Sequence, residues 1–177
     1  MSAYAFATID SPVGRLELVS DGEAVLRLGI EGPEYPLQHG GRAGQPDAVI
    51  RQATSELAEY FAGTRRTFDV PVKLVGTAFQ QAIWHELAGL GFGETAGYGD
   101  LAARAGNPHA ARAVGGAVGA NPVAIIIPCH RVLAANGKLT GYSNGSGLET
   151  KVRLLELEGI DYRQVGRASR QSSKPVI

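Results

Sequence analysis

The chain has 177 residues and a mass of 18.5 kDa, enough for one or two domains with a buried core. Hydrophobic residues make up 44% of the sequence and charged residues 19%, which argues against a mainly disordered, collagen-like or coiled-coil chain. The 17 basic residues balance the 17 acidic residues, so the net charge does not point to a polyanionic partner.

The hydropathy of the chain and the charge of its first residues indicate where in the cell we expect the protein. The central apolar stretch, Val123 to Ile127, is far shorter than the roughly 20 residues that span a bilayer. No Lys or Arg precedes Arg15, so the basic start of a secretory signal is missing. We therefore expect a cytoplasmic protein that does not contact membranes.

Alternating hydrophobic residues predict a β-hairpin near the N-terminus. Residues 16–18 and 26–30 alternate between apolar and other side chains, and the turn residues Ser20-Asp21-Gly22-Glu23 lie between them. Residues 31–45 are rich in Gly, Pro and polar groups and are expected to form a loop.

A helix and a further strand are predicted next. Apolar residues recur at helical spacing after Asp47, and Gly63 ends this pattern. Residues 67–74 then alternate as in a strand, and Pro71 favours a sheet edge because it cannot donate to a ladder.

Short helices are predicted in the centre of the chain. Thr77 is the expected N-cap of a helix that glycines 89, 91 and 93 close. Helices over 100–105 and 109–118 are separated by Gly106-Asn107-Pro108, with Asn107 as the cap and Pro108 as the first helical residue. Such a pair is typical of a helix-turn-helix motif, although many enzymes contain this corner without binding DNA.

The last part of the chain contains an apolar strand over 123–127, a helix over 149–158 and a polar tail over 163–174 that we expect to be loose. Between residues 98 and 153, six basic residues stand against two acidic ones, which allows a positive surface but is weak evidence for nucleic-acid binding. The basic residues are Arg104, Arg112, Arg131, Lys138, Lys151 and Arg153.

Cys129 is the only cysteine, which excludes an intramolecular disulfide and a multi-cysteine zinc site. The next residue is His130, and an imidazole can lower a thiol pKa enough to supply a nucleophilic thiolate. Neighbouring side chains in an extended segment point to opposite sides, so a water would have to connect the two. The alternative is a cysteine that merely fills the core after a buried strand.

The segment Pro128-Cys129-His130-Arg131-Val132 resembles the active-site segment of the O6-alkylguanine-DNA alkyltransferases, also called methylated-DNA-protein-cysteine methyltransferases. The resemblance covers about residues 76–159, and further motifs occur in the family's order and spacing. They are Gly76-Thr77, Phe79-Gln80, Trp84, Gly93-Glu94-Thr95, Tyr98-Gly99, Arg112-Ala113-Val114-Gly115, Asn121-Pro122 and Gly141-Tyr142-Ser143.

The resemblance implies an α+β fold with two domains. A small sheet with a helix, ribonuclease H-like, would occupy residues 1–75, and a mainly helical winged helix-turn-helix domain would occupy residues 76–165. Residues 166–177 would form a flexible tail. The implied activity is direct repair of alkylated double-stranded DNA by a monomer, without a metal or organic cofactor. The alkyl group of O6-alkylguanine, and of O4-alkylthymine, would pass irreversibly to Cys129, once per molecule.

The resemblance also assigns roles around the cysteine. His130 would take the Cys129 proton through a water, and Glu158 would orient the imidazole and stabilise its charged form. Tyr98 would donate a proton or hydrogen bond to the departing guanine, and Asn121 would brace the turn beneath the cysteine. Without the resemblance, each residue has a simpler interpretation. Glu158 would be a solvated carboxylate, Tyr98 a tyrosine of the core, and Asn121 the first residue of a turn.

DNA contacts are implied for the second helix of the helix-turn-helix. Arg112 would fill the space left by a nucleotide rotated out of the stack, and small neighbours would allow close approach to the minor groove. These neighbours are Ala110, Ala111, Ala113, Gly115 and Gly116. Tyr142, Ser143 and Val132 would line the base pocket. Tight packing between helices is the alternative reason for the small residues.

Three departures from the family pattern are visible. The loop over 142–151 is about two residues longer than the common form, Ala124 stands where some members have proline, and Gly91 replaces an expected proline. None removes a reacting group. Two other functions remain open: a DNA-lesion binder whose thiol is inert, and a cysteine hydrolase with an oxyanion hole.

Overall fold

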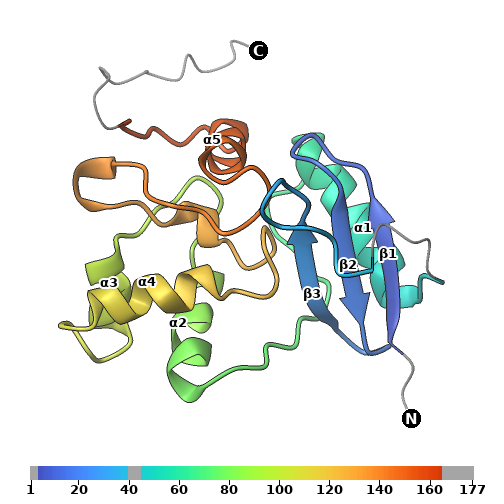
Figure 1. The fold of residues 1–177 in the computed structure, drawn as a ribbon, viewed down its shortest axis with the longest axis horizontal. Coiled ribbons are helices and arrows are strands. Elements are labelled where there is room, and N and C mark those ends of the chain that lie inside the picture. The colour runs from blue at the N-terminus through green and yellow to red at the C-terminus, as the bar shows by residue number, and fades with distance from the viewer. Residues whose placement is uncertain (1–3, 40–44, 165–177) are drawn as a thin grey trace.

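The computed structural model describes residues 4–39 and 45–164. Figure 1 shows a three-stranded sheet and helix α1 on one side of the molecule, with α2 to α5 on the other side. The strands β1 (Ala5–Ile9), β2 (Leu16–Ser20) and β3 (Val25–Ile30) are antiparallel in the order β1-β2-β3. The predicted α+β class is confirmed.

The predicted hairpin is present as β2 and β3. The carboxylate of Asp21 accepts the backbone N–H groups of Glu23 and Ala24, both at 3.0 Å, and so holds the turn. Strand β1 was not predicted, because its five residues are all half-buried and show no alternation. It pairs with β2 along its whole length.

The helix predicted after Asp47 is α1 (Ala48–Phe61). The Asp47 side chain accepts the Ile50 N–H at 2.8 Å, which is the N-cap bond that the sequence predicts. The buried residues of α1 include Ile50, Ala53 and Leu57, which belong to the same hydrophobic core as the sheet residues Leu16 and Leu18.

The strand predicted over residues 67–74 is wrong. Only an isolated bridge joins Val72 to Val25, at the free edge of β3. The backbone N–H groups of Asp69 and Val70 are bound by the carboxylate of Glu56 at 2.9 and 3.1 Å, so they are not available to a ladder. Pro71 has no N–H to add, and the segment stays irregular.

Helix α2 (Ala78–Ala88) begins as predicted at Thr77, whose side chain forms a capping box with Gln80. Trp84 of α2 is 2% exposed, and its indole N–H donates to the carbonyl of Ala117 at 2.8 Å. This bond joins α2 to α4 (Ala111–Gly119).

The two helices of the predicted helix-turn-helix are α3 (Tyr98–Arg104) and α4, which contact each other. Their predicted starts need correction. Helix α3 begins two residues early because Asp100 caps its first turn by accepting the Gly97 N–H at 2.8 Å. Asn107 and Pro108 form a turn before α4 rather than its cap and first residue, since the Asn107 carbonyl accepts the Ala110 N–H.

The strand predicted over 123–127 is also wrong. Val123 makes one bridge to Leu28, and the chain then turns, with hydrogen bonds from the Ile126 N–H to the Ala124 carbonyl and from the Ile127 N–H to the Val123 carbonyl. The segment is apolar because it is buried, and burial alone does not distinguish a strand from a turn.

Helix α5 (Leu148–Leu157) corresponds to the predicted last helix. One continuous hydrophobic cluster reaches from Leu16 of the sheet to Leu154 of α5, so the two predicted domains share a core. The predicted flexible tail, 166–177, lies outside the described residues. No helix in the described ranges is long and apolar enough to cross a membrane.

Candidate active site

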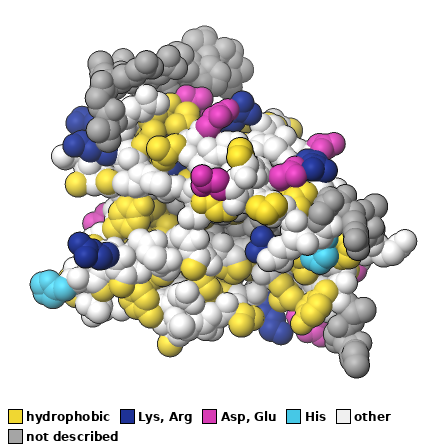
Figure 2. Space-filling model, in the orientation of Figure 1, with side chains coloured by type: hydrophobic (Ala, Val, Ile, Leu, Met, Phe, Trp, Pro, Cys, Tyr) yellow, Lys and Arg dark blue, Asp and Glu magenta, His cyan; other side chains and the backbone are white. Residues whose placement is uncertain are grey.

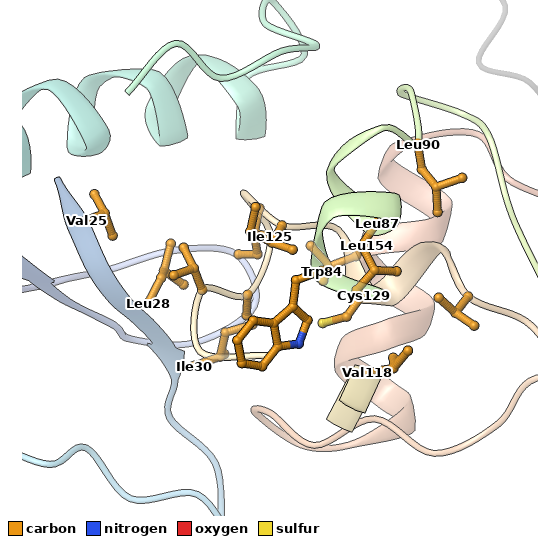
Figure 3. Close-up of a cluster of buried hydrophobic side chains, with 14 of the residues drawn as sticks. Val25, Leu28, Ile30, Trp84, Leu87, Leu90, Val118, Ile125, Cys129 and Leu154 are labelled. Atoms are coloured by element: carbon orange, nitrogen blue, oxygen red, sulfur yellow. The ribbon is translucent and has the colours of Figure 1, made fainter. Parts of the chain in front are cut away.

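Cys129 opens a single 3-10 turn, η1 (Cys129–Arg131), instead of lying in the extended segment that the sequence suggests. Its side chain is 4% exposed and belongs to the buried cluster that contains Trp84, Leu87 and Leu154 (Figure 3). The thiol is therefore held in packed surroundings, where its position is fixed.

Asn121 ties together the turn that precedes the cysteine. Its side-chain amide donates to the carbonyl of Ile127 at 2.7 Å, and its side-chain oxygen accepts the N–H of Val123 at 3.0 Å. Between these points Ile125 has a φ of 70°, which costs a β-branched residue about 1–3 kcal/mol. The two Asn121 bonds help to hold this strained turn directly before Cys129.

Glu158 is the centre of a buried polar network. Its Oε1 lies 2.8 Å from Nε2 of His130 and accepts the hydroxyl of Tyr60 at 2.8 Å. The guanidinium of Arg131 donates to both carboxylate oxygens, each at 2.8 Å. Although burial raises the pKa of Glu158, the hydrogen bonds from His130 and Arg131 outweigh it and lower this pKa to about 2.

His130 is fully buried, and desolvation lowers its pKa although Glu158 acts in the opposite direction. With the Nε2 proton donated to Glu158, the other ring nitrogen is an acceptor. That nitrogen, Nδ1, is buried and has no hydrogen-bond partner among the described residues. An unpaired ring nitrogen of this kind is able to accept a proton, and His130 directly follows Cys129 in the chain.

Lys151 is a buried ammonium group that the sequence did not single out. Its Nζ donates to the carbonyl of Val132 at 2.6 Å and to that of Thr140 at 3.3 Å. Desolvation lowers the Lys151 pKa to about 8, while the neighbouring Cys129 acts in the opposite direction. Lys151 and Arg131 are both buried, so they do not contribute to the positive surface that the sequence predicted.

The ionisation of Cys129 depends on opposing effects. Burial raises the pKa of the thiol, and the side chains of Asn121 and Tyr142 and the charge of Lys151 act to lower it. Burial has the larger effect, so the pKa stays above its ordinary value and the group is a thiol at neutral pH, while Asn121, Tyr142 and Lys151 reduce the cost of forming the thiolate.

A cavity of about 370 Å³ opens beside the thiol. Its lining comes from α3, α4, the cysteine turn, the loop after Thr140 and the segment after β3. The lining residues are Tyr35, Tyr98, Gly115, Val118, Gly119, Cys129, Gly141, Tyr142, Ser143 and Asn144.

The cavity gathers Cys129, Tyr98, Tyr142 and Ser143 from the predicted set. Val132 is not in the lining: it is fully buried, and its backbone pairs with Ala96. Further lining residues were not predicted, because no local pattern connects them to the cysteine: Tyr35, Val118, Gly119 and Asn144.

The hydroxyl of Tyr98 lies 2.6 Å from that of Thr140, another residue that the sequence analysis missed. Either oxygen is able to donate. The contact sets the direction of the Tyr98 side chain at the cavity wall, and the carbonyl of Thr140 is in turn held by Lys151.

Helix α4 presents a surface of small residues on which Arg112 is exposed. Ala113 and Gly116 are also exposed, whereas Ala110, Ala111 and Gly115 are half-buried. Figure 2 shows hydrophobic groups and uncharged polar or backbone groups over α3 and α4, with few charges. Among the described residues, no group of three His, Cys, Asp or Glu side chains is placed to hold a metal ion.

Comparisons with known proteins cover both parts of the chain. The family profile for the 6-O-methylguanine DNA methyltransferase ribonuclease-like domain matches residues 4–74, and that for the DNA binding domain matches residues 78–160. The methylated-DNA–protein-cysteine methyltransferase of Haemophilus influenzae is 43% identical over 176 residues, covering 99% of this chain and 96% of its own.

Solved structures that resemble this chain belong to the same group of proteins as the sequence relatives. The Mycobacterium tuberculosis O6-methylguanine methyltransferase superposes with a TM-score of 0.79 at 45% identity, covering 88% of this chain and 93% of its own. The structure of Mycobacterium tuberculosis OGT in complex with DNA gives a TM-score of 0.77 at 46% identity, covering 86% and 92%. The chain therefore belongs to the 6-O-methylguanine DNA methyltransferase family.

Proposed function

We propose that this protein repairs alkylated double-stranded DNA by transferring the alkyl group from O6 of guanine to Sγ of Cys129. The observation that carries the proposal is the position of Cys129 in the wall of a cavity, directly before a His130 whose imidazole is bound to Glu158. The family membership of the whole described chain supports the same reaction.

The reaction balances with groups from this chain. Nδ1 of His130 takes the thiol proton, through a water where the geometry requires it, and Glu158 stabilises the resulting imidazolium. A sulfur electron pair then forms the bond to the alkyl carbon while the carbon–oxygen bond breaks, and its electron pair leaves with guanine. We assign to the hydroxyl of Tyr98, a residue of the cavity lining, the proton or hydrogen bond that the departing base receives.

The product on the protein is a thioether, which has no easy leaving path. Each molecule therefore acts once and is consumed, so the activity is stoichiometric. The same displacement applies to an alkyl group on O4 of thymine, which we include as a second, smaller base for the cavity.

A cavity that contains the thiol cannot receive a base that remains stacked in a duplex. We propose that the nucleotide rotates out of the helix, at a cost of a few kcal/mol. Arg112 on the exposed face of α4 would fill the vacated space, and the small residues around it would let the helix approach the minor groove. Little sequence preference follows, because such contacts read shape more than base identity.

One chain holds the thiol, the His130–Glu158 pair and the DNA-facing helix, so we propose that a monomer is active. The reaction needs a reduced thiol, which the cytoplasm maintains, and we place the protein there.

Intact-mass analysis tests the function. A duplex that contains O6-methylguanine should add one methyl group per chain, mapped to the peptide with Cys129, whereas an unmodified duplex should add none. Cys129→Ala should bind the duplex and gain no methyl group. An unmodified protein that binds the lesion indicates a lesion binder, and repeated product release without modification indicates a hydrolase; either result contradicts the proposal.

A further inference from the structure

The cavity at Cys129 is not built from the C-terminal part of the chain alone. Tyr35, in the segment that follows β3, contributes to its lining together with Tyr142 and Cys129. This tyrosine lies 94 positions before the cysteine and is half-buried. The sheet side of the molecule thus supplies one wall of the site.

The position of Tyr35 is fixed by backbone contacts. Gly32 and Tyr35 exchange N–H to carbonyl hydrogen bonds at 3.0 and 3.1 Å, which closes a tight turn. Gly32 packs against Gly145, so closely that a Cβ atom on Gly32 would overlap the Gly145 carbonyl group. The turn therefore rests directly on the loop that follows Tyr142.

Two more bonds fasten this loop to the end of β3. The N–H of Gly145 donates to the carbonyl of Ile30 at 3.0 Å, and the side-chain oxygen of Asn144 accepts the Ile30 N–H at 3.3 Å. Through these bonds the loop joins the wall that carries Tyr35 to the wall that carries Tyr142.

A second cavity of about 280 Å³ lies next to the first. Its lining residues are Pro33, Glu34, Tyr35, Tyr142, Gly145, Ser146 and Gly147. Tyr35 and Tyr142 are the residues that line both cavities. The two tyrosines therefore stand between the space beside the thiol and the second space.

We propose that Tyr35 is a specificity-determining residue that limits the size of the alkyl group accepted at Cys129. This inference rests on the proposed function. A methyl group needs only the space beside the thiol. A butyl or benzyl group extends beyond that space and meets the side chains of Tyr35 and Tyr142 between the two cavities. Removal of the Tyr35 ring would open the second cavity to the distal part of such a group.

The test compares single-turnover rates on duplexes that contain O6-methyl-, O6-butyl- or O6-benzylguanine. Tyr35→Ala should raise the benzyl-to-methyl and butyl-to-methyl rate ratios by about tenfold, a change typical for a few carbon atoms gaining room in a pocket. Tyr35→Trp should lower both ratios, and Tyr35→Phe, which keeps the ring, should leave them unchanged. Tyr4→Ala is the matched control, because Tyr4 is 66% exposed and is absent from the lining of both cavities.

The outcomes separate this inference from the function itself. Absence of methyl transfer to Cys129 in the unaltered protein contradicts the proposed function. Normal methyl transfer with unchanged ratios in Tyr35→Ala and Tyr35→Trp contradicts only the role of Tyr35. Equal losses for all three alkyl groups would mean that Tyr35 contacts the DNA rather than the alkyl group, and would also overturn the inference. Tyr35→Trp keeps the test valid if Tyr35→Ala does not fold.

Discussion

Oε1 of Glu158 lies 2.8 Å from Nε2 of His130, and both side chains are completely excluded from solvent. Arg131 binds the same carboxylate, so the imidazole, the carboxylate and the guanidinium form one buried unit. A buried ion pair is stable only while each charge keeps its partner. The unit therefore combines a structural role with the orientation of the proposed base.

Glu158→Gln should impair both roles. The variant leaves the charge of Arg131 buried without a counterion, so the free energy of unfolding should fall by about 3 kcal/mol. Loss of imidazolium stabilisation should slow methyl transfer by about a hundredfold. Urea unfolding and single-turnover kinetics measure the two effects. Glu149→Gln at the start of α5, in an exposed pair with Arg153, is the control and should change neither quantity appreciably.

Protein stability should fall as the solution becomes acidic, over one pH range for each of two buried groups. Burial lowers the pKa of His130 below its ordinary 6.5, so the unfolded chain binds this proton more readily and stability is lost as the pH drops below about 6.5. The pKa of Glu158 is lowered from 4.5 to about 2, so its contribution is present above 4.5 and is lost between these values.

The urea concentration at the midpoint of unfolding, measured from pH 8 to pH 4, should show the loss of stability that His130 causes. His130→Gln should flatten the dependence between about pH 6.5 and 4.5, because the titrating group is gone. His85→Gln, at an exposed position on α2, should retain the slope of the unaltered protein. An unaltered slope in His130→Gln would show that other groups cause the acid sensitivity.

Lys151→Met should slow methyl transfer by about tenfold at pH 7. At that pH the ammonium group, with a pKa of about 8, is mainly charged and favours the Cys129 thiolate. Above pH 8 the unaltered protein also loses this charge, so the difference between the two rates should shrink. Lys138→Met, at an exposed site, should follow the unaltered protein at every pH. A rate difference that is constant with pH would indicate a purely structural role for Lys151.

Arg112→Ala should reduce repair of a duplex by about tenfold and leave transfer from free O6-benzylguanine unchanged. The reason is that only the duplex requires a side chain to replace the rotated base. Arg51→Ala on α1 tests for a general effect of removing an exposed cation. Equal losses on duplex and free base would contradict the role of Arg112.

Local signals were sufficient for much of the fold. The turn at Asp21, the cap at Asp47 and the capping box at Thr77 each depend on residues within three or four positions, and each is present. The strand predictions for 67–74 and 123–127 were wrong because side chains outside these segments bind their backbone groups. Glu56 takes the amide groups of the first, and Asn121 folds the second into a turn.

The site was predictable only in part for the same reason. Cys129 stands in a recognisable motif and Glu158 was assigned only through the family resemblance; their roles in the reaction remain predictions. Tyr60 donates to Glu158 from a position 98 residues away, so its helical pattern indicates only burial. Charged residues are usually exposed, and nothing beside Lys151 in the sequence reveals the carbonyl groups that allow it to be buried.

Trp84 is the only tryptophan of the protein, and it shares the core with Cys129 (Figure 3). Its indole N–H is bonded to α4. Indole fluorescence depends on the polarity and hydrogen bonding around the ring. Any shift of α4 against α2, whether on docking to DNA or after Cys129 gains an alkyl group, therefore changes the emission of a single known site. The chain thus carries an intrinsic optical reporter, with which the one reaction of each molecule can be followed in real time without a label.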